Sequence, residues 1–249
     1  MDNRLQKIYE HYQAHTLHIL GLDDTFQFKC RACGKCCKNR SDILLTTRDL
    51  YNIAKSLGRT MQYVVDRYCD VYVGDSSRIP LVRLLPIGPD QACPLLRDRR
   101  CIVHNAKPAV CALFPLGRLA TMDKDVEKTD LTRPTYFLQP ANCGTQEEIH
   151  TVREWLAQFG IPAEDKFYAL WTDTITFFSS LFHELETRKI PENSLNLLWN
   201  ISFSALYINY DTKTDLMSQF INNTTKLKEA LTEIENHAEE FFGGQCDGS

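Results

Sequence analysis

Four cysteines lie within eight residues near the start of the chain, at Cys30, Cys33, Cys36 and Cys37. Four more follow downstream, at Cys93, Cys101, Cys111 and Cys143. Thiolates are preferred ligands of zinc and of iron–sulfur centres, and exposed thiols in a reducing compartment oxidise or capture soft metals. Thiols at this density therefore indicate a metal or iron–sulfur site.

The spacing of the thiols allows more than one kind of centre. A Cys-x-x-Cys pair such as Cys30 and Cys33 can turn both sulfurs toward one ion, which is a standard half-site for tetrahedral zinc. Three cysteines at successive x-x intervals can also wrap the corners of a [4Fe–4S] cluster, and ferredoxin loops share the cysteine–proline step found at Cys93-Pro94. Cys36 and Cys37 are adjacent and their side chains tend to diverge, so one of them is expected to serve a second centre or a bridging position. The eight thiols suit either two four-sulfur sites or one cluster with spare cysteines.

Cations surround the first cysteine group, at Lys29, Arg31, Lys35, Lys38 and Arg40. Their charge would lower thiol pKa values and offset the negative charge of a tetrathiolate centre. Taken alone, however, such cations more often form a solvated basic loop.

Three other residues have metal-ligating side chains but weaker support. His104 could replace a thiol as a ligand, although a single histidine at a strand end is more often a surface or hydrogen-bonded group. Cys69 ends an amphipathic pattern and is expected to be a small buried apolar residue. Cys246 falls in a C-terminal stretch that we expect to be a flexible tail.

Composition bounds the class of protein. The chain has 249 residues, of which 43% are apolar and 24% charged, so it can bury a core without disulfides. Its net charge of -4 disfavours general binding to nucleic acid. The N-terminal residues lack the apolar core of a signal peptide and no stretch approaches membrane-spanning length, so we expect a cytoplasmic protein with no membrane partner. The sequence identifies no protein partner.

Periodicity predicts that the type of secondary structure changes along the chain. A helix is expected over residues 4–20, an extended segment at 26–28, a short strand at 42–45, a helix capped by Thr47 and ending near Leu57, and a helix from Thr60 to about Cys69. Short strands and loops are expected over 71–138, followed by helices at 147–159, 163–188, 192–209 and 215–242. Aromatic side chains recur along the later helices at a spacing typical of core packing.

These patterns predict an α+β fold, with an irregular cysteine-rich metal-binding domain of short strands packed against a C-terminal helical region. The expected domains are residues 1–144 for the metal-binding part with its N-terminal helix and 145–242 for the helical region. Residues 243–249 are expected to form a flexible tail.

Two motifs bring a family resemblance. The first is Cys30-Arg31-Ala32-Cys33-Gly34-Lys35-Cys36-Cys37, and the second is Cys93-Pro94, Cys101, Lys107-Pro108, Cys111 and Phe114-Pro115 in that order. Together they resemble the YkgJ-like cysteine-cluster family, also written CxxCxxCC, of zinc- or iron-chelating domains, over about residues 26–145. The chain has Ala112 where members often carry arginine, and His104 where an aromatic residue is common. The resemblance implies metal chelation, and the best-known relatives of the family are flagellin lysine methylases with a similar cluster.

The sequence therefore predicts a protein that binds zinc, iron or a [4Fe–4S] cluster through the eight clustered cysteines. The alternative is an enzyme of redox chemistry or group transfer that acts through its metal centre, distantly like the flagellin lysine N-methylases. No catalytic residue can be assigned, and whether the protein is an enzyme stays open. The helix segment His183-Glu184 begins like a zinc-protease motif but lacks the second histidine, so it is not interpreted as a zinc site.

Overall fold

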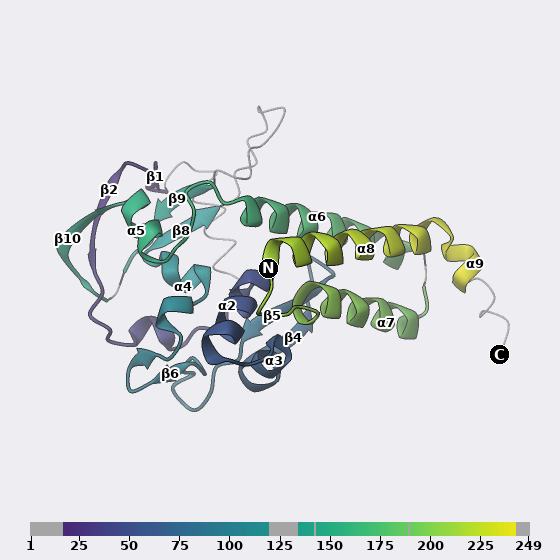
Figure 1. Cartoon of the computed structure of the whole chain (residues 1–249), viewed down its shortest axis with the longest axis horizontal. Coiled ribbons are helices and arrows are strands. Elements are labelled where there is room, and N and C mark those ends of the chain that lie inside the picture. The colour runs from purple at the N-terminus through teal and green to yellow at the C-terminus, as the bar shows by residue number, and fades with distance from the viewer. Residues whose placement is uncertain (1–16, 120–133, 142, 189, 243–249) are drawn as a thin grey trace. The chain divides into compact units, whose positions relative to one another are not determined.

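The computed structural model describes residues 17–119, 134–141, 143–188 and 190–242 (Figure 1). The predicted tail at 243–249 and most of the predicted N-terminal helix lie outside the described residues. The part of that helix that is described is not helical, because Ile19–Leu20 form strand β1. No helix within the described residues is long and apolar enough to cross a membrane.

The fold is α+β, as predicted, with short antiparallel strands and long helices. The described strands are β1 (Ile19–Leu20), β2 (Thr25–Lys29), β3 (Leu44–Leu45), β4 (Cys69–Val73), β5 (Pro80–Leu84), β6 (Leu96–Arg97), β7 (Arg100–Cys101), β8 (Leu116–Leu119), β9 (Thr135–Leu138) and β10 (Thr145–Thr151). The helices are α2 (Thr47–Leu57), α3 (Met61–Tyr68), α4 (Ala109–Leu113), α5 (Val152–Gln158), α6 (Lys166–Thr187), α7 (Glu192–Phe203), α8 (Leu216–Asn236) and α9 (Ala238–Phe242). Short 3₁₀ turns occur at Lys35–Cys37 (η1) and His104–Ala106 (η2), and a π-helical turn, η3, spans Ser204–Ile208.

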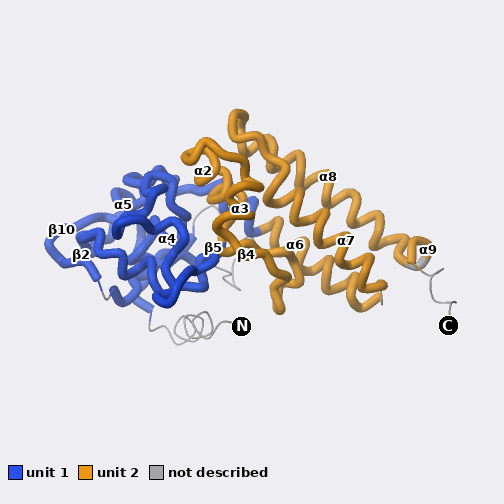
Figure 2. Tube along the Cα trace, turned by 90° about the horizontal axis from the view of Figure 1, so that it is seen from below, with its two compact units in different colours: residues 1–44, 84–172 blue, residues 45–83, 173–249 orange. Residues whose placement is uncertain are grey.

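The chain divides into two compact units, and each is built from two separate segments (Figure 2). Unit 1 comprises residues 1–44 and 84–172, and unit 2 comprises residues 45–83 and 173–249. The division of the sequence into domains at residue 144 stays a prediction.

Unit 1 is built from small sheets around one apolar core. Strands β1, β9 and β8 form one antiparallel sheet, β2 pairs with β10, and β6 pairs with β7 in a hairpin. Side chains of β2 alternate between exposed and buried, so Phe26 and Phe28 face inward. They meet the indole ring of Trp155 edge-on, with ring centroids 5.6 and 5.8 Å away. This core lies directly beside the first cysteine group in sequence, because Cys30 follows Phe28 by two residues.

Unit 2 combines helices with a short sheet. Helices α7 and α8 and most of α6 lie alongside one another (Figures 1 and 2), and their inner faces bury large apolar side chains such as Phe178, Phe182 and Phe220. Helices α2 and α3 bury Leu50, Ile53 and other apolar side chains. The β4–β5 hairpin supplies most of a three-stranded sheet of order β3-β5-β4.

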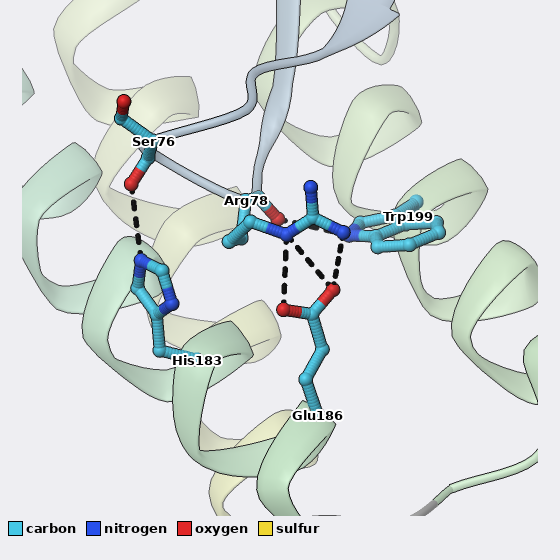
Figure 3. A network of polar contacts seen from close by, with 5 residues as sticks. All are labelled: Ser76, Arg78, His183, Glu186 and Trp199. Carbon is cyan, nitrogen blue, oxygen red and sulfur yellow. Dashed lines mark hydrogen bonds and ion pairs between the residues drawn. The ribbon is translucent and has the colours of Figure 1, made fainter.

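The turn between β4 and β5 is fastened to α6 and α7 by a polar network (Figure 3). Arg78 has a positive φ of 54°, and its guanidinium donates to both carboxylate oxygens of Glu186. The Trp199 indole N–H donates to the Arg78 carbonyl at 2.9 Å, and His183 Nε2 lies 3.0 Å from the Ser76 carbonyl oxygen. His183 and Glu186 thus hold the β4–β5 turn in place. They belong to the helix segment that begins like a zinc-protease motif.

Two predicted helix starts are corrected by the structure. Thr46, rather than Thr47, caps α2, because its side chain accepts from the Asp49 N–H at 3.2 Å while the Asp49 carboxylate accepts from the Thr46 N–H. Residues 147–151, predicted to be helical, form the end of β10 because they pair with β2. Helix α5 begins only at Val152, after the Thr151 cap.

Candidate metal centre

All eight predicted ligand cysteines lie in unit 1, whereas Cys69 lies in unit 2. Cys30 and Cys36 are exposed and the other six are half-buried. None of the cysteines in the described part of the chain forms a disulfide. One compact unit therefore gathers the thiols of the two motifs and separates them from the cysteine that the sequence assigned to helix packing.

The first four thiols lie on a tight loop that follows strand β2. The Ala32 N–H lies 3.4 Å from the Cys30 sulfur, which folds the loop back on its first cysteine. Gly34, with φ 71°, precedes the 3₁₀ turn that carries Cys36 and Cys37. A left-handed conformation there suits glycine, which has no Cβ to clash.

The second segment is joined to this loop through the backbone. The Cys93 N–H donates to the Cys37 carbonyl at 2.7 Å, and the Asn39 N–H donates to the Gln91 carbonyl at 3.0 Å. In the hairpin that follows, Cys101 pairs with Leu96. Backbone hydrogen bonds thus set Cys93 and its hairpin beside the first cysteine loop.

The core of unit 1 positions Cys111. This cysteine lies in the short helix α4, and its N–H donates to the Pro108 carbonyl at 2.8 Å. Two residues later, the Leu113 carbonyl accepts from the Trp155 indole at 3.0 Å. Trp155 therefore contacts both Phe28, just before the first thiols, and the end of the helix that carries Cys111.

Strand pairing positions Cys143. Thr145 of β10 pairs with Lys29 of β2, so Cys143 and Cys30 flank the same end of the two-stranded sheet. Gly144, between Cys143 and Thr145, has φ 80°, and a Cβ at that position would lie 2.5 Å from Phe28 Cε2 and 2.8 Å from the Lys29 carbonyl oxygen. The close approach of these two segments of the chain requires glycine at position 144.

Cys36 and Cys37 form a coupled pair at the centre of the group, with their sulfurs 3.9 Å apart. The hydrogen bond between the two thiols lowers the pKa of Cys36 against the opposing effect of burial, and the charges of Lys107 and Arg40 lower it further. The same hydrogen bond raises the pKa of Cys37, as do burial and the nearby Cys36, Cys93 and Cys111. One thiolate is therefore favoured at this pair over two.

The pKa values of three further thiols are raised. Burial raises the pKa of Cys93 and of Cys101, and the neighbouring thiol Cys36 adds to both effects. Burial also raises the pKa of Cys143 to about 11, with further contributions from Cys36, from Cys33 and from Cys30. These mutual effects show that the thiols of four separate chain segments influence one another electrostatically.

Of the five loop cations, three are engaged by carboxylates. Lys29 pairs with Glu148 at 3.0 Å, Lys38 with Asp90 at 2.6 Å, and Arg40 with Asp42 at 2.9 Å. The charge of Arg40 also lowers the pKa of Cys36. The cation that sequence reasoning missed is Lys107, which acts on both Cys36 and Cys101. Lys107 could have been noticed in the sequence, because it belongs to the Lys107-Pro108 step of the second motif.

His104 faces an aromatic ring. Its imidazole lies 6.3 Å from the Phe159 ring, edge to face. Burial and the charges of Lys107 and Arg100 lower the pKa of this histidine. The Lys107 ammonium lies over the same Phe159 ring, 4.0 Å from its centroid. Lys107 and His104 therefore both contact Phe159.

The donor chemistry of the site fits a soft metal, because its candidate ligands are thiols that influence one another's charge. As placed, however, no three histidine, cysteine or carboxylate groups within the described residues lie close enough to share one ion. Metal binding would require thiols to turn toward a common point. The ligand set stays a prediction.

Comparison with protein families gives one match. Residues 29–149 match the model of the CxxCxxCC family, described as a "putative zinc- or iron-chelating domain". No curated protein and no solved structure matches the chain. The match spans both cysteine motifs, from the residue before Cys30 to beyond Cys143. The family model thus confirms, over residues 29–149, the resemblance to the CxxCxxCC family that the two cysteine motifs indicated.

Proposed function

We propose that unit 1 chelates zinc or iron through its eight clustered thiols. The observation that carries the proposal is the gathering of those thiols, from four segments, into one compact unit where their charges interact. Deprotonated thiols so arranged repel one another, and a bound cation relieves that repulsion. Metal binding at such a site is coupled to folding.

The interactions suggest two sets of four thiols. Cys143 interacts with Cys30, Cys33 and Cys36, which makes one set. Cys37 interacts with Cys93 and Cys111, and Cys93 with Cys101, which makes the other. Cys36 also interacts with Cys93 and Cys101, so it stands between the sets. On this proposal, the adjacent residues Cys36 and Cys37 serve different centres.

The first experiment measures metal content after anaerobic purification. We expect two zinc equivalents per chain if the centres are mononuclear, or iron with inorganic sulfide and visible absorption if they are clusters. Elemental analysis and an absorption spectrum distinguish these outcomes. Protein with neither zinc nor iron above background would refute the proposal.

Serine variants test the two sets. If the sets are independent, Cys143→Ser and Cys111→Ser should each lose one centre and keep the other, because each removes a ligand from a different set. Cys69→Ser is the matched control, since Cys69 lies in unit 2, and it should keep the full metal content. Loss of all metal in either ligand variant would indicate one shared centre. Full metal content in both would remove these residues from the ligand set.

A metal-dependent enzyme stays the alternative prediction, and it rests on the resemblance to methylases alone. The two proposals differ in coordination. A chelating or structural site fills its ligand positions with protein thiols, whereas a catalytic site keeps one position open. Binding of an added small ligand, such as azide or cyanide, to the loaded metal would favour the enzyme.

A further inference from the structure

A second candidate site lies in unit 2, in a groove with a volume of about 930 Å³. One wall is the turn between α2 and α3, and the other is the segment between η3 and α8. The side chains that matter for its chemistry are Lys55, Arg59, Tyr63, Tyr210, Asp211 and Lys213, and we call this the basic groove. Its size is that of a site for a small organic ligand.

The basic groove carries more positive than negative charge. Three cations, Lys55, Arg59 and Lys213, face one carboxylate, Asp211. None of the three cations forms an ion pair with a carboxylate in the described part of the chain. The Asp211 carboxylate instead accepts the Lys213 N–H at 2.9 Å. An excess of unpaired cations in a hollow favours an anionic occupant.

The two cations of the first wall are positioned by aromatic rings and by the backbone. The Lys55 ammonium lies 5.7 Å from the centroid of Tyr51, and the Arg59 guanidinium lies 5.3 Å from that of Tyr63. Gly58 ends α2 in a left-handed conformation, and the Arg59 N–H then donates to the Ala54 carbonyl at 2.9 Å. Lys55 and Arg59 are thus presented from a defined helix end.

The second wall is fixed by side chains from both neighbouring helices. The Tyr51 hydroxyl contacts the carbonyls of Thr212 and Thr214 at 3.1 and 2.6 Å. The Gln219 side chain bonds both the N–H and the carbonyl of Asp211, at 2.7 and 3.0 Å. A wall held this way is formed before any ligand arrives, which lowers the entropic cost of binding.

We propose that the basic groove binds a small ligand that bears two or more phosphates, such as a nucleoside di- or triphosphate. Several cations around one hollow suit a compact polyanion, since lysine and arginine are the common phosphate-binding side chains. The net charge of the chain, -4, opposes binding of a long polyanion, which would extend beyond the groove. Tyr63, which is 41% exposed, offers a ring face or edge to an attached base.

The test is calorimetric titration of the full-length protein with ATP, pyrophosphate, orthophosphate and a single-stranded oligonucleotide, without added divalent metal. We expect one saturable site for ATP and pyrophosphate, with orthophosphate weaker because it carries fewer charges. Tighter binding of ATP than of pyrophosphate would show that the base contributes. Equal affinities would show that the phosphates alone are recognised.

Charge variants provide the decisive comparison. Arg59→Ala and Lys213→Ala should each weaken ATP binding about fivefold, the effect of losing one partly exposed ion pair. Asp211→Asn should tighten binding, because the amide keeps an acceptor for the Lys213 N–H but removes the opposing charge. Lys226→Ala, an exposed cation of α8 outside the groove, is the matched control and should leave the affinity unchanged.

Circular dichroism and metal content, unchanged in every variant, would show that the folds of both units are intact. The proposal is overturned if neither ATP nor pyrophosphate saturates, if the lysine and arginine variants bind as the parent does, or if Asp211→Asn weakens binding. Binding of the oligonucleotide alone would also overturn it. The result is independent of metal chelation, because the groove lies wholly in unit 2.

Discussion

At the scale of single residues, Cys36 is chemically distinct from the other thiols. Its hydrogen bond with Cys37 is the largest cause of its lowered pKa, and the charges of Lys107 and Arg40 lower the pKa further. The thiolate is the nucleophilic form of cysteine. In metal-free protein, Cys36 should therefore be alkylated faster than Cys143 at neutral pH. As pH rises, Cys143 should gain reactivity only as the pH approaches about 11, where burial has moved its pKa.

The contribution of Lys107 can be measured on the same protein. Replacing Lys107 by methionine removes the charge and keeps an apolar side chain beside Phe159, so the pKa of Cys36 should rise. The Cys36 pKa lies at about 6, so the rate of Cys36 alkylation at pH 5, where the thiolate is the minor form, should fall about threefold, as expected for the loss of one partly screened charge. Lys166→Met, in unit 1 but outside the thiol group, is the control. Mass-mapped alkylation rates give the result, and an unchanged Cys36 rate would contradict it.

The sequence identified the cysteines by density and order, but it could not give their electrostatic setting. The spacing of the thiols within residues 30–37 can be read directly from the sequence. The influence of Lys107 on Cys36 depends on folding that brings residues 71 positions apart in the sequence close together. For the same reason, the sequence predicted that Lys29 and Lys38 act on the thiols, whereas in the fold they form ion pairs with Glu148 and Asp90.

At the scale of elements, the pairing of β2 with β10 brings the first and last predicted ligands to one sheet end. Gly144→Ala should disrupt this pairing, because the new Cβ would overlap Phe28 and the Lys29 carbonyl. Gly160→Ala is a matched control, since Gly160 also has a positive φ, 63°, but has open space around it. The control should lose about 1 kcal/mol of unfolding free energy from backbone strain alone.

The Gly144 variant should lose clearly more stability than this control, and it should also bind metal less tightly. Denaturant unfolding and zinc titration measure the two effects. If both variants lose the same stability and keep the same metal affinity, the strand pairing does not position Cys143.

Element prediction succeeded where local signals decided the structure. Helix α3 begins after the Thr60 cap, as predicted, and ends one residue before Cys69. It failed at residues 147–151, where Glu147 and Glu148 favour a helix but Lys29 on the partner strand pairs with them in a sheet. The capping box of Thr151 and Glu154 was a local sign that the helix starts later.

At the scale of the whole molecule, the two units should respond differently to metal removal. The cysteine segments of unit 1 are short elements and turns, whereas unit 2 buries the apolar faces of long helices. A chelator should therefore reduce amide protection in residues 30–44 and 84–119 and leave α7 and α8 protected. Hydrogen exchange with mass spectrometry measures this by segment. Equal loss of protection in both units would contradict it.

The segmented construction of the units also has a consequence for synthesis on the ribosome. Residues 45–83 emerge early, but their partners within unit 2 begin at residue 173. Unit 1 ends at residue 172, so every thiol of the group has been translated before helices α7 and α8 of unit 2. On the proposed function, the nascent chain can bind metal at this stage. The apolar faces of α2, α3 and the β4–β5 hairpin stay exposed until residues 173–249 have been translated. A chaperone that shields such faces would act on this interval of translation.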